Sequence, residues 1–326
     1  MTRVFSGIQP TGRKHLGNYI GAIRHYVADQ DLGEAFFCIV DLHSISVPYD
    51  AETLAENTRD TAATLLAAGL EPDRCTLFMQ SDVDEHPYGA WLLGALASFG
   101  ELRRMTQFKE KSEGQDSVSV DLFTYPVLQA ADILLYRADR VPVGDDQRQH
   151  LELARDIAGR FNTRYGELFP LPEAAIPSSG GRVMDLQLPT NKMSTTGGTP
   201  QGTVLLEDPP EVVAKKIRSA VTDSGREVRR GEGKEGIANL IEIMSVATGS
   251  SAEQIEQSYD GRGYGQFKAD VADAVVELLR PLQERAAELR ADPAQLSAIL
   301  ADGAGRARAV ASVTLAEMKQ RMGFRG

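Results

Sequence analysis

Two short polar segments carry residues suited to binding phosphate groups. The first, Pro10–Asn18, contains His15 and two glycines and directly follows the apolar run Val4–Ile8. A strand that leads through a glycine-containing turn into a helix N-terminus presents backbone N–H donors to an anion. The second segment, Asn191–Gly198, combines one lysine with hydroxyl and backbone donors. Together the two segments predict that a triphosphate is bound from two sides.

His15 and Gly17 make the first segment the more specific of the two. Gly17 has no side chain, so a nucleotide ring or ribose could approach the backbone there. A histidine can donate a hydrogen bond to a phosphate oxygen without a fixed charge, and it can stabilise a pentacoordinate phosphorus as it forms. A lone His-x-Gly also fits a histidine that only caps a helix. The position of His15, just after the first apolar run, favours phosphate binding instead.

A third group of polar residues falls on one face of an expected apolar helix. Tyr125, Gln129, Asp132 and Tyr136 are spaced i, i+4, i+7 and i+11 among leucine, isoleucine and phenylalanine residues. Such a stripe either faces water or lines a pocket. From the residues alone, a stripe that faces water is the favoured interpretation.

Alternating apolar runs and helical patterns position these segments. Strands are expected at Arg3–Ile8, Ala35–Asp41, Thr76–Gln80 and Arg140–Val143. Helices are expected at His15–Ala28, Ala51–Ala68, Tyr88–Phe99, Asp121–Tyr136 and Asp146–Thr163. The alternation predicts an α/β fold with a doubly wound parallel sheet. Ligands in such folds bind beyond the carboxyl ends of the strands, which brings together Gln9–Thr11, Asp41–His43, Gln80–Asp82 and Gly144–Gln147.

The strand signals stop near residue 206. Helices are expected beyond it at Pro209–Val221, Glu235–Thr248, Ala252–Ser258, Lys268–Arg290 and Ala294–Met322. We therefore predict a Rossmann-like catalytic domain at residues 1–206 and an all-α domain at residues 207–326.

The composition is that of an ordinary globular protein of 326 residues, with 42% hydrophobic and 25% charged residues. No apolar stretch reaches the roughly 18 residues of a membrane-spanning helix, and no signal peptide is expected. Cys38 and Cys75 both lie in apolar runs and fit reduced core residues. These features predict a cytoplasmic protein without a metal site.

The charge restricts how a nucleic acid could bind. With a formal net charge of -11, the chain would have to meet such a partner with a local basic surface. Lys215–Lys234 contains seven basic and three acidic residues, and Gly303–Gly326 contains five and one. Each stretch also fits a solvated helix face.

Several stretches, in order along the whole chain, resemble the bacterial tryptophanyl-tRNA synthetases of class I. Phe5–Gly12 with His15–Ala22 is similar to the family's form of the His-Ile-Gly-His signature. Gly100–Ser112, Ala131–Tyr136 and Val141–Gln147 are similar to further family stretches. The resemblance implies that the carboxylate of L-tryptophan attacks the α-phosphorus of ATP, giving tryptophanyl-adenylate and pyrophosphate. The 2′-hydroxyl of the terminal adenosine of tRNA(Trp) would then accept the acyl group.

The resemblance also implies roles for single residues. The catalytic groups would be His15, Lys111 and Lys192. ATP would contact Gln9, Pro10, Thr11, Gly17, Asn18, Gly144, Asp145, Asp146, Val183, Lys192, Met193, Ser194, Thr195 and Thr196. Tryptophan would contact Phe5, His43, Tyr125, Gln129, Asp132, Val141, Val143 and Gln147. Asp132 would accept the indole N–H, because indole is a donor only.

The partners implied by the resemblance are ATP, Mg²⁺, tRNA(Trp) and a second copy of the chain, with the tRNA anticodon bound by the helical domain. One position departs from the family. Its second signature is usually Lys-Met-Ser-Lys-Ser, whereas Lys192–Thr196 reads Lys-Met-Ser-Thr-Thr. The second lysine is therefore absent, and Mg²⁺, Lys192 and Lys111 are the candidates to share its charge. Gln129 stands where better-known members have methionine.

Three other functions were weighed. A tyrosyl-tRNA synthetase has a similar architecture, but the Gly144–Gln147 and Met105–Lys109 stretches match the tryptophan enzymes better. A non-catalytic regulator that binds nucleotide or tryptophan would explain the missing lysine. A small-molecule nucleotidyltransferase would leave the helical third without a role. Tryptophan-dependent exchange of pyrophosphate into ATP separates the enzyme from the regulator.

Overall fold

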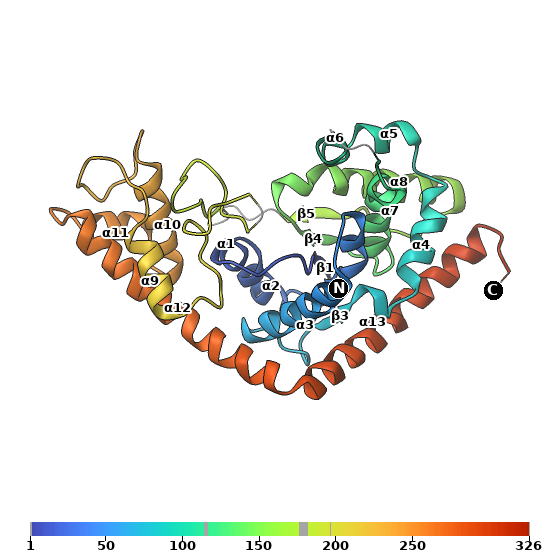
Figure 1. Cartoon of the computed structure of the whole chain (residues 1–326). Helices are drawn as coiled ribbons and strands as arrows, with labels where there is room; N and C mark the ends of the chain where they lie inside the picture. Colours follow the sequence, from blue (N-terminus) through green and yellow to red (C-terminus); the bar gives the residue numbers. More distant parts are fainter. Residues whose placement is uncertain (1, 114–116, 176–181, 196, 326) are drawn as a thin grey trace. The chain divides into compact units, whose positions relative to one another are not determined.

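The computed structural model of the chain describes all residues except 1, 114–116, 176–181, 196 and 326 (Figure 1). The described residues form two compact units. Unit 1 takes its residues from Met1–Thr11, Tyr26–Ile176 and Asp292–Gly326. Unit 2 takes its residues from Gly12–His25 and Pro177–Ala291. This division differs from the predicted boundary at residue 206, because the last helix packs on the sheet and residues 12–25 group with the helical part.

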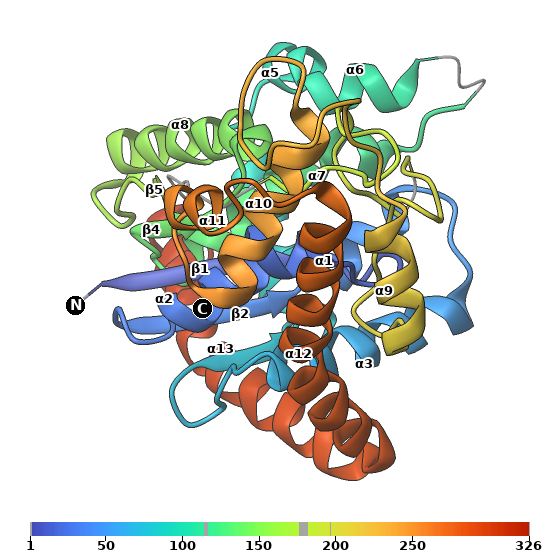
Figure 2. The ribbon, with the colours of Figure 1, turned by 90° about the vertical axis from the view of Figure 1, so that its left-hand side faces the viewer.

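Unit 1 contains a parallel sheet of five strands in the order β3-β2-β1-β4-β5, which Figure 2 shows side by side. The strands are β1 (Arg3–Ile8), β2 (Glu34–Ile39), β3 (Thr76–Met79), β4 (Arg140–Pro142) and β5 (Glu173–Ala175). The chain passes outward from β1 to β2 and β3, then returns to the other side of β1 for β4 and β5. This change of direction next to β1 is the place where doubly wound sheets bind ligands. The predicted fold class is confirmed.

Helices and short 3₁₀ turns connect these strands. They are η2 (Asp41–Ser46), α3 (Ala51–Ala67), η3 (Gln80–Asp82), α4 (Glu85–Gly94), α5 (Phe99–Arg104), α6 (Thr106–Ser112), α7 (Val120–Leu134), η4 (Asp145–Gln147), α8 (Arg148–Tyr165) and α13 (Pro293–Arg321). The core is largest where α7 meets the sheet. There the Tyr136 ring lies 4.5 Å from the Phe36 ring and 5.4 Å from the Phe5 ring, measured between centroids.

The helix α13 packs against the sheet of unit 1. It packs on β3 and α4, and a Cβ added to Gly303 would lie 1.8 Å from the carbonyl oxygen of Leu77. Only glycine allows the helix backbone to come this close to the strand. In Figure 1 the red helix accordingly runs beside β3.

Unit 2 combines helices with irregular segments. Its elements are α1 (Leu16–Asn18), the π-helical turn η1 (Tyr19–Ile23), α9 (Pro210–Arg218), α10 (Glu235–Thr248), α11 (Ala252–Ser258) and α12 (Tyr264–Ala291). The helix α2 (Arg24–Asp29) continues η1 into unit 1. Phe267, Val271 and Val275 of α12 are buried, and α12 packs on α9 and α10. No helix in the described ranges is long and apolar enough to cross a membrane.

Candidate active site

The four polar segments predicted to meet in unit 1 do lie at one edge of the sheet. They follow the carboxyl ends of β1, β2, β3 and β4, and all four strands are parallel. Hydrogen bonds join the segments after β2 and β3 directly, among them one from the Ser81 hydroxyl to Oδ2 of Asp41. The Leu42 N–H donates to Oε1 of Gln80 over 3.2 Å, and the Ser81 N–H donates to Oδ1 of Asp41 over 3.0 Å.

Asp132 of α7 is the centre of a buried polar network at this edge. Its side chain is only 1% exposed. Its Oδ2 lies 2.8 Å from Nε2 of His43, and its Oδ1 accepts from Nε2 of Gln80 over 2.7 Å. His86 of α4 approaches the same Oδ1 with Nδ1 at 2.6 Å, and its Nε2 lies 2.8 Å from the hydroxyl of Tyr136. The polar stripe of α7 therefore points inward at Asp132 and Tyr136, and the expectation of a water-facing stripe is wrong for these residues.

The network keeps Asp132 ionised. Burial raises the pKa of this carboxyl, but the hydrogen bonds from His43 and His86 lower it by more, to about 2. A carboxylate is an acceptor only, and here its position is determined by three side chains from η2, η3 and α4. Asp132 is thus a charged hydrogen-bond acceptor of defined geometry.

Tyr125 lies two stripe positions before Asp132 on α7 and is also held by side chains. Its hydroxyl donates to Oε1 of Gln107 over 3.1 Å and lies 2.8 Å from Nε2 of His150. Burial lowers the pKa of His150 to about 4, so this imidazole is neutral and can donate its Nε2 proton to the phenol oxygen. Burial also raises the pKa of Tyr125 to about 12. The hydroxyl therefore remains protonated.

The turn after β4 places Gln147 beside Asp146. A Cβ on Gly144 would lie 2.5 Å from Oδ1 of Asp146, so the Asp146 carboxylate packs directly over the Gly144 backbone. Nε2 of Gln147 donates to Oδ2 of Asp146 over 2.9 Å, and Nε2 of Gln129 lies 3.5 Å from Oε1 of Gln147. The side chain of Asp145 lies outside the described part of the structure.

The remaining predicted tryptophan contacts are apolar. Phe5 and Val141 are buried in the core of unit 1, and Val143 is half-buried against it. All the residues predicted to contact tryptophan thus belong to unit 1. The sequence predicted no role for Gln107, His86 or His150. In the structure, His86 hydrogen-bonds to Asp132, and Gln107 and His150 hydrogen-bond to Tyr125. A lone histidine within a helix carries no functional signal in a single sequence, so His86 and His150 could not be assigned a role from the sequence.

Residues 12–18 of the first phosphate-type segment and the described residues of the second belong to unit 2. The chain around His15 pairs with a later segment, since Leu16 N–H donates to the Val204 carbonyl over 2.8 Å and Leu206 N–H donates to the Lys14 carbonyl over 2.9 Å. The Asn18 side chain accepts the His15 N–H over 3.0 Å. A Cβ on Gly17 would lie 3.0 Å from Nδ1 of His15, so glycine keeps the imidazole in place.

His15 is neutral in this setting. Burial lowers its pKa most, and the charges of Lys14 and Lys192 lower it further, to about 4. The side chain is 6% exposed, and within the described residues its Nδ1 has no hydrogen-bond partner. A buried ring nitrogen without a partner is available for a ligand atom.

The second segment forms a loop that we call the Lys192 loop, residues 192–198, of which Thr196 lies outside the described residues. The Met193 side chain is buried, and its N–H donates to the Val183 carbonyl over 3.0 Å. Oγ1 of Thr195 lies 3.0 Å from where a Cβ on Gly12 would be. The structure therefore brings His15, the Lys192 loop and Val183 into one unit, as predicted for a phosphate site.

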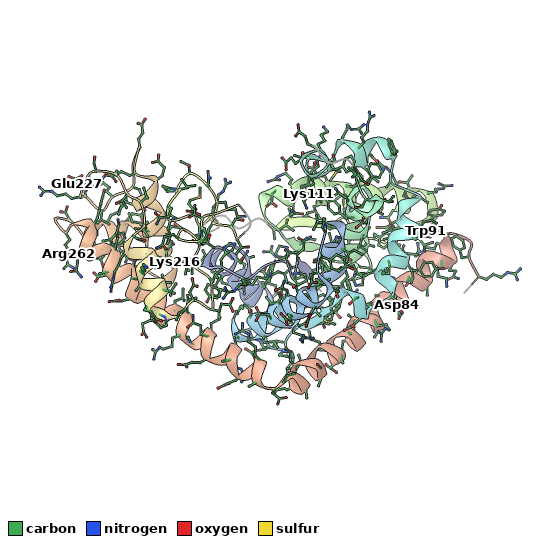
Figure 3. The ribbon with its side chains drawn as sticks, in the orientation of Figure 1. Asp84, Trp91, Lys111, Lys216, Glu227 and Arg262 are labelled. Carbon is green, nitrogen blue, oxygen red and sulfur yellow. The ribbon has the colours of Figure 1, made fainter. Side chains whose placement is uncertain are left out.

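The third predicted catalytic residue belongs to unit 1 and not to unit 2. Lys111 is on α6 of unit 1 and exposed, with Nζ 5.9 Å from the centroid of the Tyr125 ring (Figure 3). Gln9, Pro10 and Thr11 also belong to unit 1, directly before the Gly12–His25 segment of unit 2.

Comparison with known proteins shows the family to which the chain belongs. Residues 1–280 match the family model described as tRNA synthetases class I (W and Y). This chain belongs to that family. Among curated relatives of this synthetase, tryptophan--tRNA ligase 2 of Streptomyces avermitilis is 53% identical and covers 99% of this chain and 97% of its own length. The tryptophan--tRNA ligase of Mycobacterium leprae is 50% identical over 99% of this chain and 96% of its own.

Solved structures give the same family. The synthetase is similar to tryptophanyl-tRNA synthetase from Mycoplasma pneumoniae, with a TM-score of 0.91 and 36% identity over 100% of this chain and 98% of that one. It is similar to the enzyme from Campylobacter jejuni, complexed with ADP and tryptophan, with a TM-score of 0.86 and 34% identity over 99% and 100% of the two chains. A tyrosyl-tRNA synthetase from Archaeoglobus fulgidus has a TM-score of 0.68 at 22% identity, over 87% of this chain and 90% of its own, and shares the fold.

Proposed function

We propose that this chain is a tryptophan--tRNA ligase that makes tryptophanyl-adenylate from L-tryptophan and ATP and then transfers the acyl group to tRNA(Trp). In the first step the tryptophan carboxylate attacks the α-phosphorus and pyrophosphate leaves. In the second step the 2′-hydroxyl of the terminal adenosine attacks the acyl carbon and AMP leaves. Both steps depend on positioning and on stabilisation of charge, so no protein nucleophile is required.

The observation that carries this proposal is the buried Asp132 network. An indole N–H needs an acceptor of fixed position, and Asp132 is an ionised acceptor held by His43, Gln80 and His86. It lies where the sheet changes direction beside β1, and relatives about half identical in sequence are tryptophan--tRNA ligases. The Tyr125 hydroxyl and Gln147 amide are the proposed contacts of the substrate's α-amino group.

The contacts to the phosphates of ATP are proposed for unit 2. Neutral His15 would donate to a phosphate oxygen, and Lys192 would neutralise charge on the leaving pyrophosphate. No group of three or more His, Cys, Asp or Glu side chains suited to a metal exists among the described residues. We infer that Mg²⁺ would be held mainly through the phosphates of ATP, as is usual for this ion, where it would neutralise phosphate charge.

Exchange of labelled pyrophosphate into ATP tests the proposal. The purified chain should catalyse this exchange with tryptophan and not with tyrosine, because a phenol hydroxyl needs a donor as well as an acceptor and the Asp132 carboxylate is an acceptor only. It should then charge tRNA(Trp). Exchange without any dependence on tryptophan would contradict the assignment.

We propose that tRNA binds a basic surface on α9 and the segment after it. Lys215 and Arg218 are exposed on α9, and Arg226 and Arg229 are exposed on the following loop. Lys216, which belongs to the same basic stretch, is different. It is buried, and its Nζ donates to Oδ2 of Asp208 and to the Thr203 carbonyl, both over 2.7 Å. Its charge therefore serves the fold of unit 2.

Reversing the four exposed charges to glutamate should weaken tRNA charging and reduce its dependence on salt. Each lost phosphate contact lowers the slope of log affinity against log salt by about 0.7 to 0.9. Pyrophosphate exchange should keep its native rate, because it requires no tRNA. An equal loss in both assays would instead indicate general instability, and a native charging rate would exclude this surface.

We propose that the chain is located in the cytoplasm. We also propose that it forms a homodimer through exposed apolar side chains of unit 1. The chain's single tryptophan, Trp91, is 81% exposed on the outside of α4 (Figure 3), and Phe99 and Val120 are exposed on the neighbouring helices α5 and α7. A surface of this kind fits a second copy of itself. Trp91→Glu should convert a dimer into a monomer in analytical ultracentrifugation. A monomeric native chain would exclude the dimer, and a dimeric variant would exclude this face.

A further inference from the structure

Asp185 is a buried carboxylate next to the Lys192 loop, and neither the resemblance nor the reaction gives it a role. Its side chain is 0% exposed. Its Oδ1 accepts the N–H groups of Gln187 and Leu188 over 2.8 Å and 3.0 Å. Its Oδ2 accepts the N–H of Thr199 over 2.8 Å, and the Thr199 hydroxyl donates to Oδ1 over 3.1 Å.

These contacts fix both ends of the Lys192 loop to one residue. Asn191 precedes the loop, and its carbonyl accepts the N–H of Asp185 over 2.8 Å. Thr199 follows the loop and donates to the Asp185 carboxylate through its N–H and its hydroxyl. Within the loop, the Gly198 N–H donates to the Ser194 carbonyl over 3.1 Å. Asp185 therefore contacts the chain directly before and directly after the loop.

Two glycines leave the space that this carboxylate occupies. A Cβ on Gly202 would lie 1.8 Å from Oδ1 of Asp185. A Cβ on Gly198 would lie 2.3 Å from the Ser194 carbonyl oxygen and 3.0 Å from Oδ2 of Asp185. Any other residue at Gly202 would displace the carboxylate from its donors, so the local sequence is adapted to Asp185.

Contact with Thr199, directly after the loop, is one of the interactions that keep Asp185 ionised. Burial raises the pKa of the carboxyl, but the N–H donors of Thr199, Gln187 and Leu188 lower it to below its ordinary value. A loop that moved away from Thr199 would leave a buried carboxylate without part of its donors, which is costly.

We propose that Asp185 is a positioning residue that holds the Lys192 loop in the conformation that binds phosphate. The proposal rests on the proposed role of that loop. With Thr195 in place of a second lysine, the loop has less charge with which to bind a phosphate. A preformed loop compensates for this, because none of the remaining interaction energy is used to order it.

The test is Asp185→Asn. Both carboxylate oxygens of Asp185 accept backbone N–H groups, so the amide N–H₂ of the variant would face an N–H donor at one of the two positions. The kcat of tryptophan-dependent pyrophosphate exchange should fall about tenfold to a hundredfold, the loss expected when a catalytic group is misplaced by about 1 Å. The KM for tryptophan should stay native, because the tryptophan contacts belong to unit 1. Asp270→Asn is the matched control. Asp270 accepts hydrogen bonds from Tyr259 over 2.7 Å and Gln266 over 2.8 Å on helices away from the loop, so its variant should keep the native kcat.

Combining Asp185→Asn with Lys192→Ala distinguishes a positioning role of Asp185 from a general effect on protein stability. If Asp185 acts through the loop, the double variant should lose little more kcat than Lys192→Ala alone. Thr199→Val removes the hydroxyl that donates to Asp185 and accepts the Gly202 N–H over 2.9 Å, but keeps the Thr199 N–H donor. It should give a smaller loss of the same kind if Asp185→Asn does not fold. Native kcat in a folded Asp185 variant, or fully additive losses with Lys192→Ala, would overturn the proposal. A native rate for Lys192→Ala alone would instead refute the role of the loop.

Discussion

Replacing Asp132 with asparagine should lower kcat/KM for tryptophan by up to about 10⁴-fold, because a site built around a substrate hydrogen bond discriminates on that scale. The KM for ATP should remain near its native value. Asp132 accepts three hydrogen bonds from His43, Gln80 and His86. An amide can accept through one atom only, so at least one of these donors, or the indole N–H, would face an N–H₂ group.

The same experiment can separate substrate binding from folding. Asp121→Asn, near the start of the same helix, is the control and should behave as native, since its side chain is remote from the network. A tryptophan analogue with sulfur in place of the indole nitrogen should be a poor substrate for the native chain. It should lose little further rate in Asp132→Asn. Native kinetics for tryptophan in the folded variant would remove Asp132 from the tryptophan site.

Removing the charge of Lys192 should lower kcat for adenylate formation by about 10²–10³-fold or more, the typical cost of one donor that stabilises developing charge. Lys192 is the only cation in the Lys-Met-Ser-Thr-Thr stretch, so it should carry more of the charge than it would beside a second lysine. Tryptophan affinity measured without ATP should not change. Thr195→Lys should partly restore the rate of Lys192→Ala.

Lys192→Ala should also change the titration of His15. The Lys192 charge is one of three causes that lower the pKa of His15 to about 4. Without it the pKa should rise toward the ordinary value, so more of the imidazole is protonated at mildly acidic pH, and NMR titration should show this. Arg280→Ala, an exposed cation on α12, should alter neither rate nor titration. If Lys192→Ala forms adenylate at the native rate, Lys192 does not neutralise the pyrophosphate charge. Lys109, Lys111 and Mg²⁺ would then be the groups that do so.

The parts of the fold with long periodic signals could be predicted from the sequence. Glu235–Thr248 and Ala252–Ser258 are helices with the expected bounds, and β1 spans Arg3–Ile8 as expected. The three-residue strand β5 was missed, because Glu-Ala-Ala has no pattern of a strand. The helix expected at His15–Ala28 is broken into α1, a π-helical turn and α2.

Site residues that stand in a short sequence motif could be predicted. Residues whose role depends on partners distant in sequence could not. His15, Gly17 and Lys192 stand in recognisable motifs, and the structure places them in one unit. Asp185 looks like any loop aspartate in the sequence, because its donors are backbone groups that only the fold brings together. Lys216 looks like part of a basic surface, whereas its partner Asp208 is eight residues earlier and buries its charge.

The position of α13 bears on how the protein is made. The helix covers β3, where Gly303 contacts the Leu77 backbone, yet it is synthesised more than two hundred residues after that strand. A nascent chain can pair β1, β2 and β3 early, but one face of β3 stays uncovered until residues 293–321 have left the ribosome. Pairings so distant in sequence form slowly and expose apolar surface meanwhile. The unit with the proposed tryptophan contacts is thus completed only at the end of translation, the process that its product would supply.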